Sequence, residues 1–136
     1  MYLGYLLRAG GVIVPHKYIR PQSYAVTPAQ MQDLSAERDT TGVLHRDVVD
    51  HAPSKIEFET ADGLTNTEIA ALAGIFRAAF TSLKARTLVL EYYVPDTDSY
   101  ASGTFYMPDV QYKIKWIDKA NNIIIYEPGR FAFIEY

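Results

Sequence analysis

Residues 65–83, TNTEIAALAGIFRAAFTSL, form the segment in which apolar side chains recur at the spacing of a helix face. These side chains lie three or four positions apart and are Ile69, Leu72, Ala73, Phe76, Ala79, Phe80 and Leu83. Thr65 is a typical N-cap, and Glu68 three residues later completes a capping box, in which each side chain bonds the other residue's amide. We therefore predict one amphipathic helix over residues 65–83. Its buried face carries Ile69, Leu72, Phe76 and Phe80, while Glu68 and Arg77 point outward.

On either side of this helix, the chain alternates between apolar and polar residues, which is the pattern of half-buried strands. The segments Lys55–Thr60 and Thr87–Val94 show it clearly, and Gly10-Gly11 supplies a hairpin turn near the N-terminus. The predicted fold is a single domain over residues 1–136 that is mainly β with one helix. We expect a β-barrel or β-sandwich flanked by that helix.

Residues 110–116 have the most regular alternation of the chain. Val110, Tyr112, Ile114 and Trp116 are separated by Gln111, Lys113 and Lys115. We expect the apolar side of this strand to face the core and the lysines to face solvent, since a half-buried strand has one face of each kind.

Residues 29–53 have the least core-like pattern, because few of them are apolar and many are charged. Thr40-Thr41-Gly42 is typical of a turn, so we expect one strand to enter it near Leu34 and another to leave it from Val43 to Val49. A polar segment of this length is unusual inside a compact domain. We predict a hairpin arm over residues 29–53 that projects from the body onto a neighbouring subunit. The candidate interface residues are Arg38, Asp39, His45, Arg46 and Asp47.

The overall composition is that of an ordinary globular protein of 136 residues, with a net charge of −3 and no cysteine. The absence of cysteine excludes disulfides, thiolate nucleophiles and zinc–thiolate sites. No apolar run approaches the roughly 20 residues that a membrane span needs, so we expect no membrane partner. The eleven tyrosines suit strands and also surfaces that become buried on assembly.

Two short motifs resemble functional loops only in part. His45-Arg46-Asp47 copies the start of a protein-kinase catalytic loop, but the downstream Asn, the Gly-rich loop and the strand lysine are missing. The segment Asp96–Tyr100 resembles the start of a calcium loop, whose sixth and twelfth positions here hold Ala101 and Met107 instead of Gly and Glu. We interpret the first as a charged hairpin strand and the second as a polar turn.

The remaining polar residues form no pattern that predicts catalysis or metal binding. His16, His45 and His51 fall on separate predicted loops or strands without ligand spacing. Glu57 and Glu59 lie side by side on a polar strand face, where both are expected to be solvated. Catalysis by a paired acid and base would need one of them to be buried, so that their pKa values differ. We therefore expect no enzyme, no catalytic residue, no metal site and no cofactor.

Aromatic residues interleaved with lysines are also typical of surfaces that bind single-stranded nucleic acid. In residues 110–116, however, the aromatics and lysines fall on opposite faces, and the net charge is mildly acidic. We expect no specific nucleic-acid binding.

Seven short and different pieces of sequence, spread over nearly the whole chain, form a distinctive pattern when taken together in their order. They are residues 1–7, 13–19, 38–39, 42–46, 55–60, 106–109 and 132–136. In this order they resemble a family of small uncharacterised proteins of tailed bacteriophages and of prophages in Gram-positive bacteria. The family offers no catalytic motif to transfer.

The layout of strands, single helix and projecting hairpin is also similar to the tail-tube superfamily, which includes tail tube, distal tail and baseplate hub proteins. This second likeness is an analogy of architecture. It implies a structural protein of the virion tail, present in the host cytoplasm during assembly, that forms ring or tube assemblies of six copies or a multiple of six. The likeness leaves open whether the protein repeats along the tail tube or forms one ring at its end as a distal tail or baseplate adaptor. Its partners would be copies of itself and other tail proteins, and its lumen would face DNA during passage. The alternative is a small binding or tail-assembly factor outside the virion that acts as a monomer or dimer.

Overall fold

The computed structural model describes residues 1–30, 33–48 and 52–136. About 45% of the chain is strand, and the single α-helix is α1 (Asn66–Ala79), which confirms the predicted mainly β fold with one helix. The strands of the first half are β1 (Leu7–Ala9), β2 (Val12–Ile13), β3 (Ala25–Thr27), β4 (Asp33–Arg38), β5 (Leu44–Val48), β6 (Lys55–Glu59) and β7 (Leu64–Thr65). The second half contains β8 (Phe80–Ser82), β9 (Thr87–Val94), β10 (Ser99–Tyr106), β11 (Ile114–Asp118), β12 (Ile123–Tyr126) and β13 (Arg130–Glu135).

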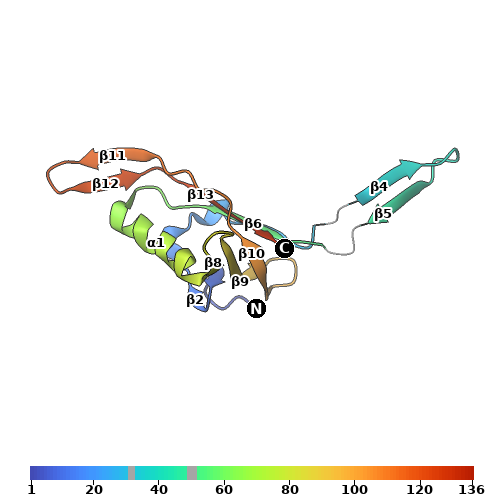
Figure 1. Cartoon of the computed structure of the whole chain (residues 1–136), viewed down its shortest axis with the longest axis horizontal. Coiled ribbons are helices and arrows are strands. Elements are labelled where there is room, and N and C mark those ends of the chain that lie inside the picture. Colours follow the sequence, from blue (N-terminus) through green and yellow to red (C-terminus); the bar gives the residue numbers. More distant parts are fainter. Residues whose placement is uncertain (31–32, 49–51) are drawn as a thin grey trace.

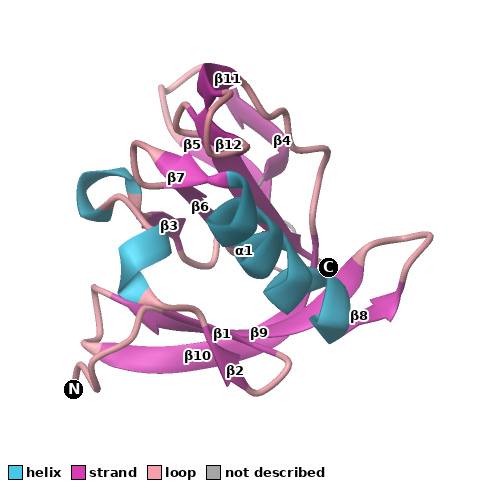
Figure 2. Ribbon diagram, turned by 90° about the vertical axis from the view of Figure 1, so that its left-hand side faces the viewer, coloured by secondary structure: helices cyan, strands magenta, loops and turns pink. Residues whose placement is uncertain are grey.

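The main sheet has eight strands, seven of them in the order β2-β1-β9-β10-β13-β6-β3, with β8 joined to β9. Its described strands form a path that ends at β2 and β3. All its pairings are antiparallel. Figure 2 shows α1 lying in the angle between the β1–β9–β10 part and the β6–β3 part of the sheet. The sheet is therefore bent around the helix and leaves two further strand groups outside it.

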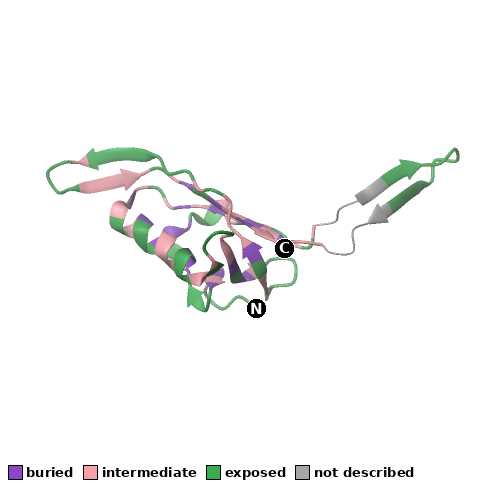
Figure 3. Ribbon diagram, in the orientation of Figure 1, coloured by how far each residue is buried: buried purple, intermediate pink, exposed green. Residues whose placement is uncertain are grey.

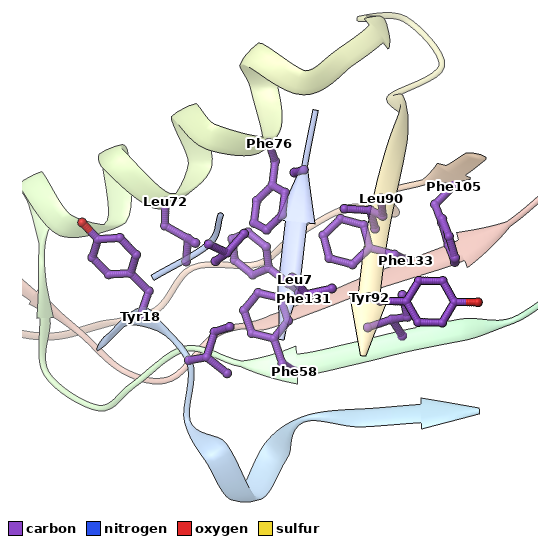
Figure 4. Packing of buried hydrophobic residues seen from close by; sticks show 14 of the residues in the cluster. Leu7, Tyr18, Phe58, Leu72, Phe76, Leu90, Tyr92, Phe105, Phe131 and Phe133 are labelled. Atoms are coloured by element: carbon purple, nitrogen blue, oxygen red, sulfur yellow. The ribbon is translucent and has the colours of Figure 1, made fainter. Parts of the chain in front are cut away.

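The core lies between α1 and the concave side of this sheet (Figure 4). Phe58, Phe76, Phe131 and Phe133 are buried and contact one another, with the Phe76 and Phe133 ring centroids 5.0 Å apart. In β6 the alternation predicted from sequence is confirmed, because Ile56 and Phe58 are buried between half-buried charged neighbours. Burying an aromatic side chain of this kind contributes about 1.5–3 kcal/mol.

The helix begins as predicted and ends earlier than predicted. Thr65 caps it, and both bonds of the capping box with Glu68 are present, so Glu68 is half-buried instead of pointing outward. Its buried residues are Ile69, Leu72 and Phe76. The predicted end at Leu83 is wrong, because residues Phe80–Ser82 turn into an extended strand that pairs with β9.

The prediction that the apolar side of residues 110–116 faces the core is correct for Val110, which packs against the core, and wrong from Tyr112 onward, since Tyr112 is 43% exposed. Strand β11 begins only at Ile114, and both Ile114 and Trp116 are exposed, at 53% and 58%. A register shift separates these two residues, and Lys115 between them forms an ion pair with Asp62 at 3.0 Å. The shift breaks the predicted alternation, because Ile114 and Trp116 lie opposite the neighbouring residues Tyr126 and Ile125, which point to different faces.

Candidate subunit interface

Strands β4 and β5 form a two-stranded sheet of their own, separate from the two sheets of the body. In Figure 1 this hairpin, which we call the arm, lies at one end of the long axis of the molecule, beyond the C-terminus. Every residue from 36 to 46 is exposed (Figure 3). Residues 36–46 therefore bury little against the rest of the described chain, and they lie within residues 29–53, for which the sequence predicts a projecting arm. Residues 31–32 and 49–51 of that range lie outside the described residues.

The tip of the arm is built around the carboxylate of Asp39. Its Oδ1 accepts hydrogen bonds from the Thr41 amide at 2.9 Å, the Thr41 hydroxyl at 2.7 Å and the Val43 amide at 3.0 Å. Its Oδ2 lies 3.0 Å from His45 Nε2. Gly42 adopts a φ of +87°, which other residues rarely tolerate, and so closes the turn.

These contacts lower the pKa of Asp39 to about 2, chiefly through the hydrogen bond with His45 and then through those with Thr41 and Val43. Asp39 is therefore charged at any physiological pH. The Arg38 guanidinium donates to the Gly42 carbonyl at 3.0 Å. Three of the five predicted interface residues thus shape the tip of the arm itself.

Of the other two predicted residues, Arg46 lies opposite Ala36 in the hairpin and Asp47 opposite Ser35. The side chain of Asp47 lies outside the described part of the structure. The structure brings four of the five predicted side chains onto one exposed hairpin, but it contains no second copy that they could contact.

The two faces of the arm differ in charge. Glu37 pairs directly with His45, and Asp39 follows on the same side, because alternate residues of a strand share a face. On the opposite face, Arg38 pairs with Leu44. One face therefore carries carboxylates, and the other carries Arg38, Arg46 and the aliphatic side chain of Leu44.

Apolar side chains at the tip are the feature that sequence reasoning missed. Val43 and Leu44 are 55% and 44% exposed. The signal was present in the sequence, since two aliphatic residues directly after a Gly turn have nothing nearby to cover them. A tip with an apolar pair beside fixed charges is suited to a protein contact.

The base of the arm is fixed to the body by hydrogen bonds. The Ala29 amide donates to Ser54 Oγ at 3.0 Å, and the Gln30 amide donates to the Pro53 carbonyl at 2.9 Å. Ser54 is buried and also accepts from the Tyr92 hydroxyl at 3.1 Å. The arm therefore leaves the body from a defined anchor.

The polar residues considered for chemistry are placed apart from one another. His16 contacts the Tyr2 hydroxyl at 2.6 Å and His45 contacts Asp39, whereas His51 lies outside the described residues. Within the part of the chain that is described, no three His, Cys, Asp or Glu side chains are grouped to hold a metal ion. That the chain is not an enzyme stays a prediction.

The two glutamates of β6 have arginine partners. Glu57 accepts from Arg130 Nε at 2.8 Å, and Glu59 lies 3.5 Å from the Arg20 guanidinium. The predicted polar turn lies between β9 and β10 at residues 95–98, while Ser99 already belongs to β10, and Asp98 accepts from the Tyr93 hydroxyl at 2.7 Å. These residues thus have structural contacts that account for their positions.

Comparison with known proteins gives a family for the chain. Residues 1–136 match the family model DUF6711, described as a family of unknown function, so the chain belongs to this family. No curated protein matches the chain. In the described residues, no helix is both long and apolar enough to cross a membrane.

Proposed function

We propose that this chain is a structural protein of a bacteriophage tail, which assembles into a ring or tube by placing its arm on a neighbouring copy. The single observation that supports the proposal most strongly is the arm itself. It is a two-stranded hairpin whose residues 36–46 are all exposed, and its base is fixed to the body by the hydrogen bond from the Ala29 amide to Ser54. A two-stranded hairpin alone in water is marginally stable at best. Such a hairpin gains its stability when a partner covers it.

The charge distribution of the arm supports a contact between different surfaces of two copies. Its carboxylate face and its arginine face cannot both match the same patch on a neighbour. A contact between unlike patches repeats from copy to copy, and it closes into a ring when the rotation between copies permits. Exposed ion pairs are worth about 0–1 kcal/mol singly, so their role here is to select the partner patch. The whole-chain resemblance to proteins of tailed phages supports a phage particle as the assembly that contains such a ring.

The test is whether the protein is part of the particle. Particles of a phage that encodes this chain are purified, and the chain is quantified by mass spectrometry and located with gold-labelled antibody. We expect several copies per particle, all at the tail. A variant in which residues 33–50 are replaced by a short Gly-Ser turn is expected to fold and to be missing from particles. The matched control replaces the exposed turn of residues 96–99 in the same way and still enters particles.

Absence of the intact chain from purified particles contradicts the proposal. If the chain is also strictly monomeric, the alternative function, a tail-assembly factor outside the virion, replaces the proposed one.

A further inference from the structure

The β11–β12 hairpin is a second projecting element, and it is apolar where the arm is charged. Strand β11 is the edge of the three-stranded sheet β11-β12-β7, so one of its sides pairs with no strand of the described residues. Four large apolar side chains within residues 112–117 are exposed: Tyr112, Ile114, Trp116 and Ile117. A free edge that carries such residues is a site at which another strand readily pairs.

Both faces of this hairpin are apolar. Trp116 lies opposite Ile125, and Ile117 lies opposite Ile124, so the two pairs point to opposite sides of the hairpin. Strand β12 pairs with β7 at Ile125 and Tyr126, and the Ile124 amide donates to Asn66 Oδ1 at the start of α1. The turn between β11 and β12 extends past the helix, at one end of the molecule (Figure 1). Figure 3 shows this end as exposed on β11 and half-buried on β12. Exposed apolar surface of this kind marks an interaction site.

The charges on the hairpin are complementary to those of the arm. Residues 110–122 contain three lysines and one aspartate, a net charge of +2. Residues 33–48 contain four acidic residues and two arginines, a net charge of −2 with His neutral. Lys113 and Lys119 are exposed and have no carboxylate within ion-pair distance in the described residues. Their like charges disfavour the pairing of β11 with a second β11, whereas an acidic strand is attracted.

The arm and this hairpin also lie at opposite ends of the long axis of the molecule (Figure 1). Two complementary surfaces at opposite ends of one chain can join only by contact between different copies, head to tail. We propose that the exposed edge and apolar side chains of β11 receive the arm of a neighbouring copy. The carboxylate face of the arm then meets Lys113 and Lys119, and Val43, which lies on that same face, packs near Trp116. The pairing is an addition of one strand to a free sheet edge.

This inference names the receiving surface for the self-assembly in the proposed function and rests on that assembly. It is tested by cross-linking, for which a chain without cysteine is well suited because every thiol is then an introduced one. One population carries Val43→Cys and a second, with a different affinity tag, carries Ile114→Cys. The two are mixed and treated with a short bis-maleimide. The control replaces Ile114→Cys with Leu83→Cys, whose native side chain is 70% exposed at the end of β8.

We expect a cross-linked species carrying both tags from the Val43 and Ile114 pair, and at least tenfold less from the Val43 and Leu83 pair. In one contrary result, the intact chain assembles while the two cysteine pairs cross-link equally or not at all. That result overturns the inference and is compatible with the proposed function. A chain that stays monomeric at high concentration, without cross-links, and is missing from particles overturns both.

A charge exchange tests the same surface without thiols. The double variant Lys113→Glu and Lys119→Glu is expected to need roughly tenfold more protein to assemble. Adding Glu37→Lys to this variant restores attraction and should recover most of the loss. A control that replaces Lys84→Glu, an exposed lysine after β8, is expected to assemble as the native chain does. Unchanged assembly of the double variant, or failure of Glu37→Lys to rescue it, contradicts the inference.

Discussion

The carboxylate of Asp39 and the imidazole of His45 meet at the tip of the arm, with Oδ2 of Asp39 3.0 Å from Nε2 of His45. The same carboxylate holds the amides of Thr41 and Val43 through its other oxygen. The shape of an exposed, charged element thus depends on one ionised side chain. Its ionisation can be followed directly.

We predict that the tip of the arm is structured down to low pH. The pKa of Asp39 in the folded arm is about 2, below the value of about 3.9 for a free aspartate. A lowered pKa means that the contacts stabilise the tip fully above about pH 4, and that this contribution is lost as the pH falls through about 2. The measurement is NMR of the Thr41 and Val43 amides between pH 6 and pH 1.5.

The Asp39→Asn variant is the control for this prediction. In it, the NMR signals of the Thr41 and Val43 amides should no longer change as the pH falls through about 2. A midpoint near pH 4 in the native chain would show that Asp39 does not organise the turn. Helix circular dichroism over the same range separates loss of the tip from unfolding of the body.

A second prediction concerns the anchor of the arm. Ser54→Ala removes the acceptor of the Ala29 amide and of the Tyr92 hydroxyl, both of which point at a buried oxygen. Leaving buried polar groups without partners costs about 1–3 kcal/mol. Chemical denaturation should show this loss, whereas Ser102→Ala, at an exposed position of β10, should change stability by less than about 0.5 kcal/mol. Equal effects of the two substitutions would contradict the role given to Ser54.

The helix prediction is tested at the core. Phe76 is fully buried against Phe131 and Phe133, so Phe76→Ala should cost about 3–5 kcal/mol of unfolding free energy. Arg77→Ala changes the next residue, which is exposed, and serves as the control. A loss below 1 kcal/mol for Phe76→Ala would mean that α1 is peripheral to the fold.

A fourth prediction is that the purified protein carries no metal ion. It rests on the absence of cysteine and on the separation of His16 from His45. Elemental analysis of protein prepared without a histidine tag should find no transition metal at stoichiometric level. One zinc ion per chain would contradict it.

The sequence was most informative where local physics determines the outcome. The capping box at Thr65 and Glu68 and the alternation of Lys55–Glu59 were predicted correctly because their contacts lie within a few residues. The arm was predicted from the lack of apolar residues, which excludes it from any core.

The errors occurred where tertiary contacts override a local pattern. Residues 80–82 continue the helical spacing, yet their backbone pairs with β9. Trp116 and Ile114 alternate with lysines, but alternation does not reveal whether the body reaches far enough to cover them. The exposure of Ile114 and Trp116 therefore could not be predicted from the sequence, whereas the hairpin turn at Gly42 could.

Electron microscopy of the purified protein shows directly whether copies of this chain join through the arm. The intact chain at high concentration is compared with the variant in which a Gly-Ser turn replaces residues 33–50. We predict closed rings or short tubes of the intact chain and only folded monomers of the variant. Strictly monomeric intact protein, or rings that persist without the arm, would contradict the account.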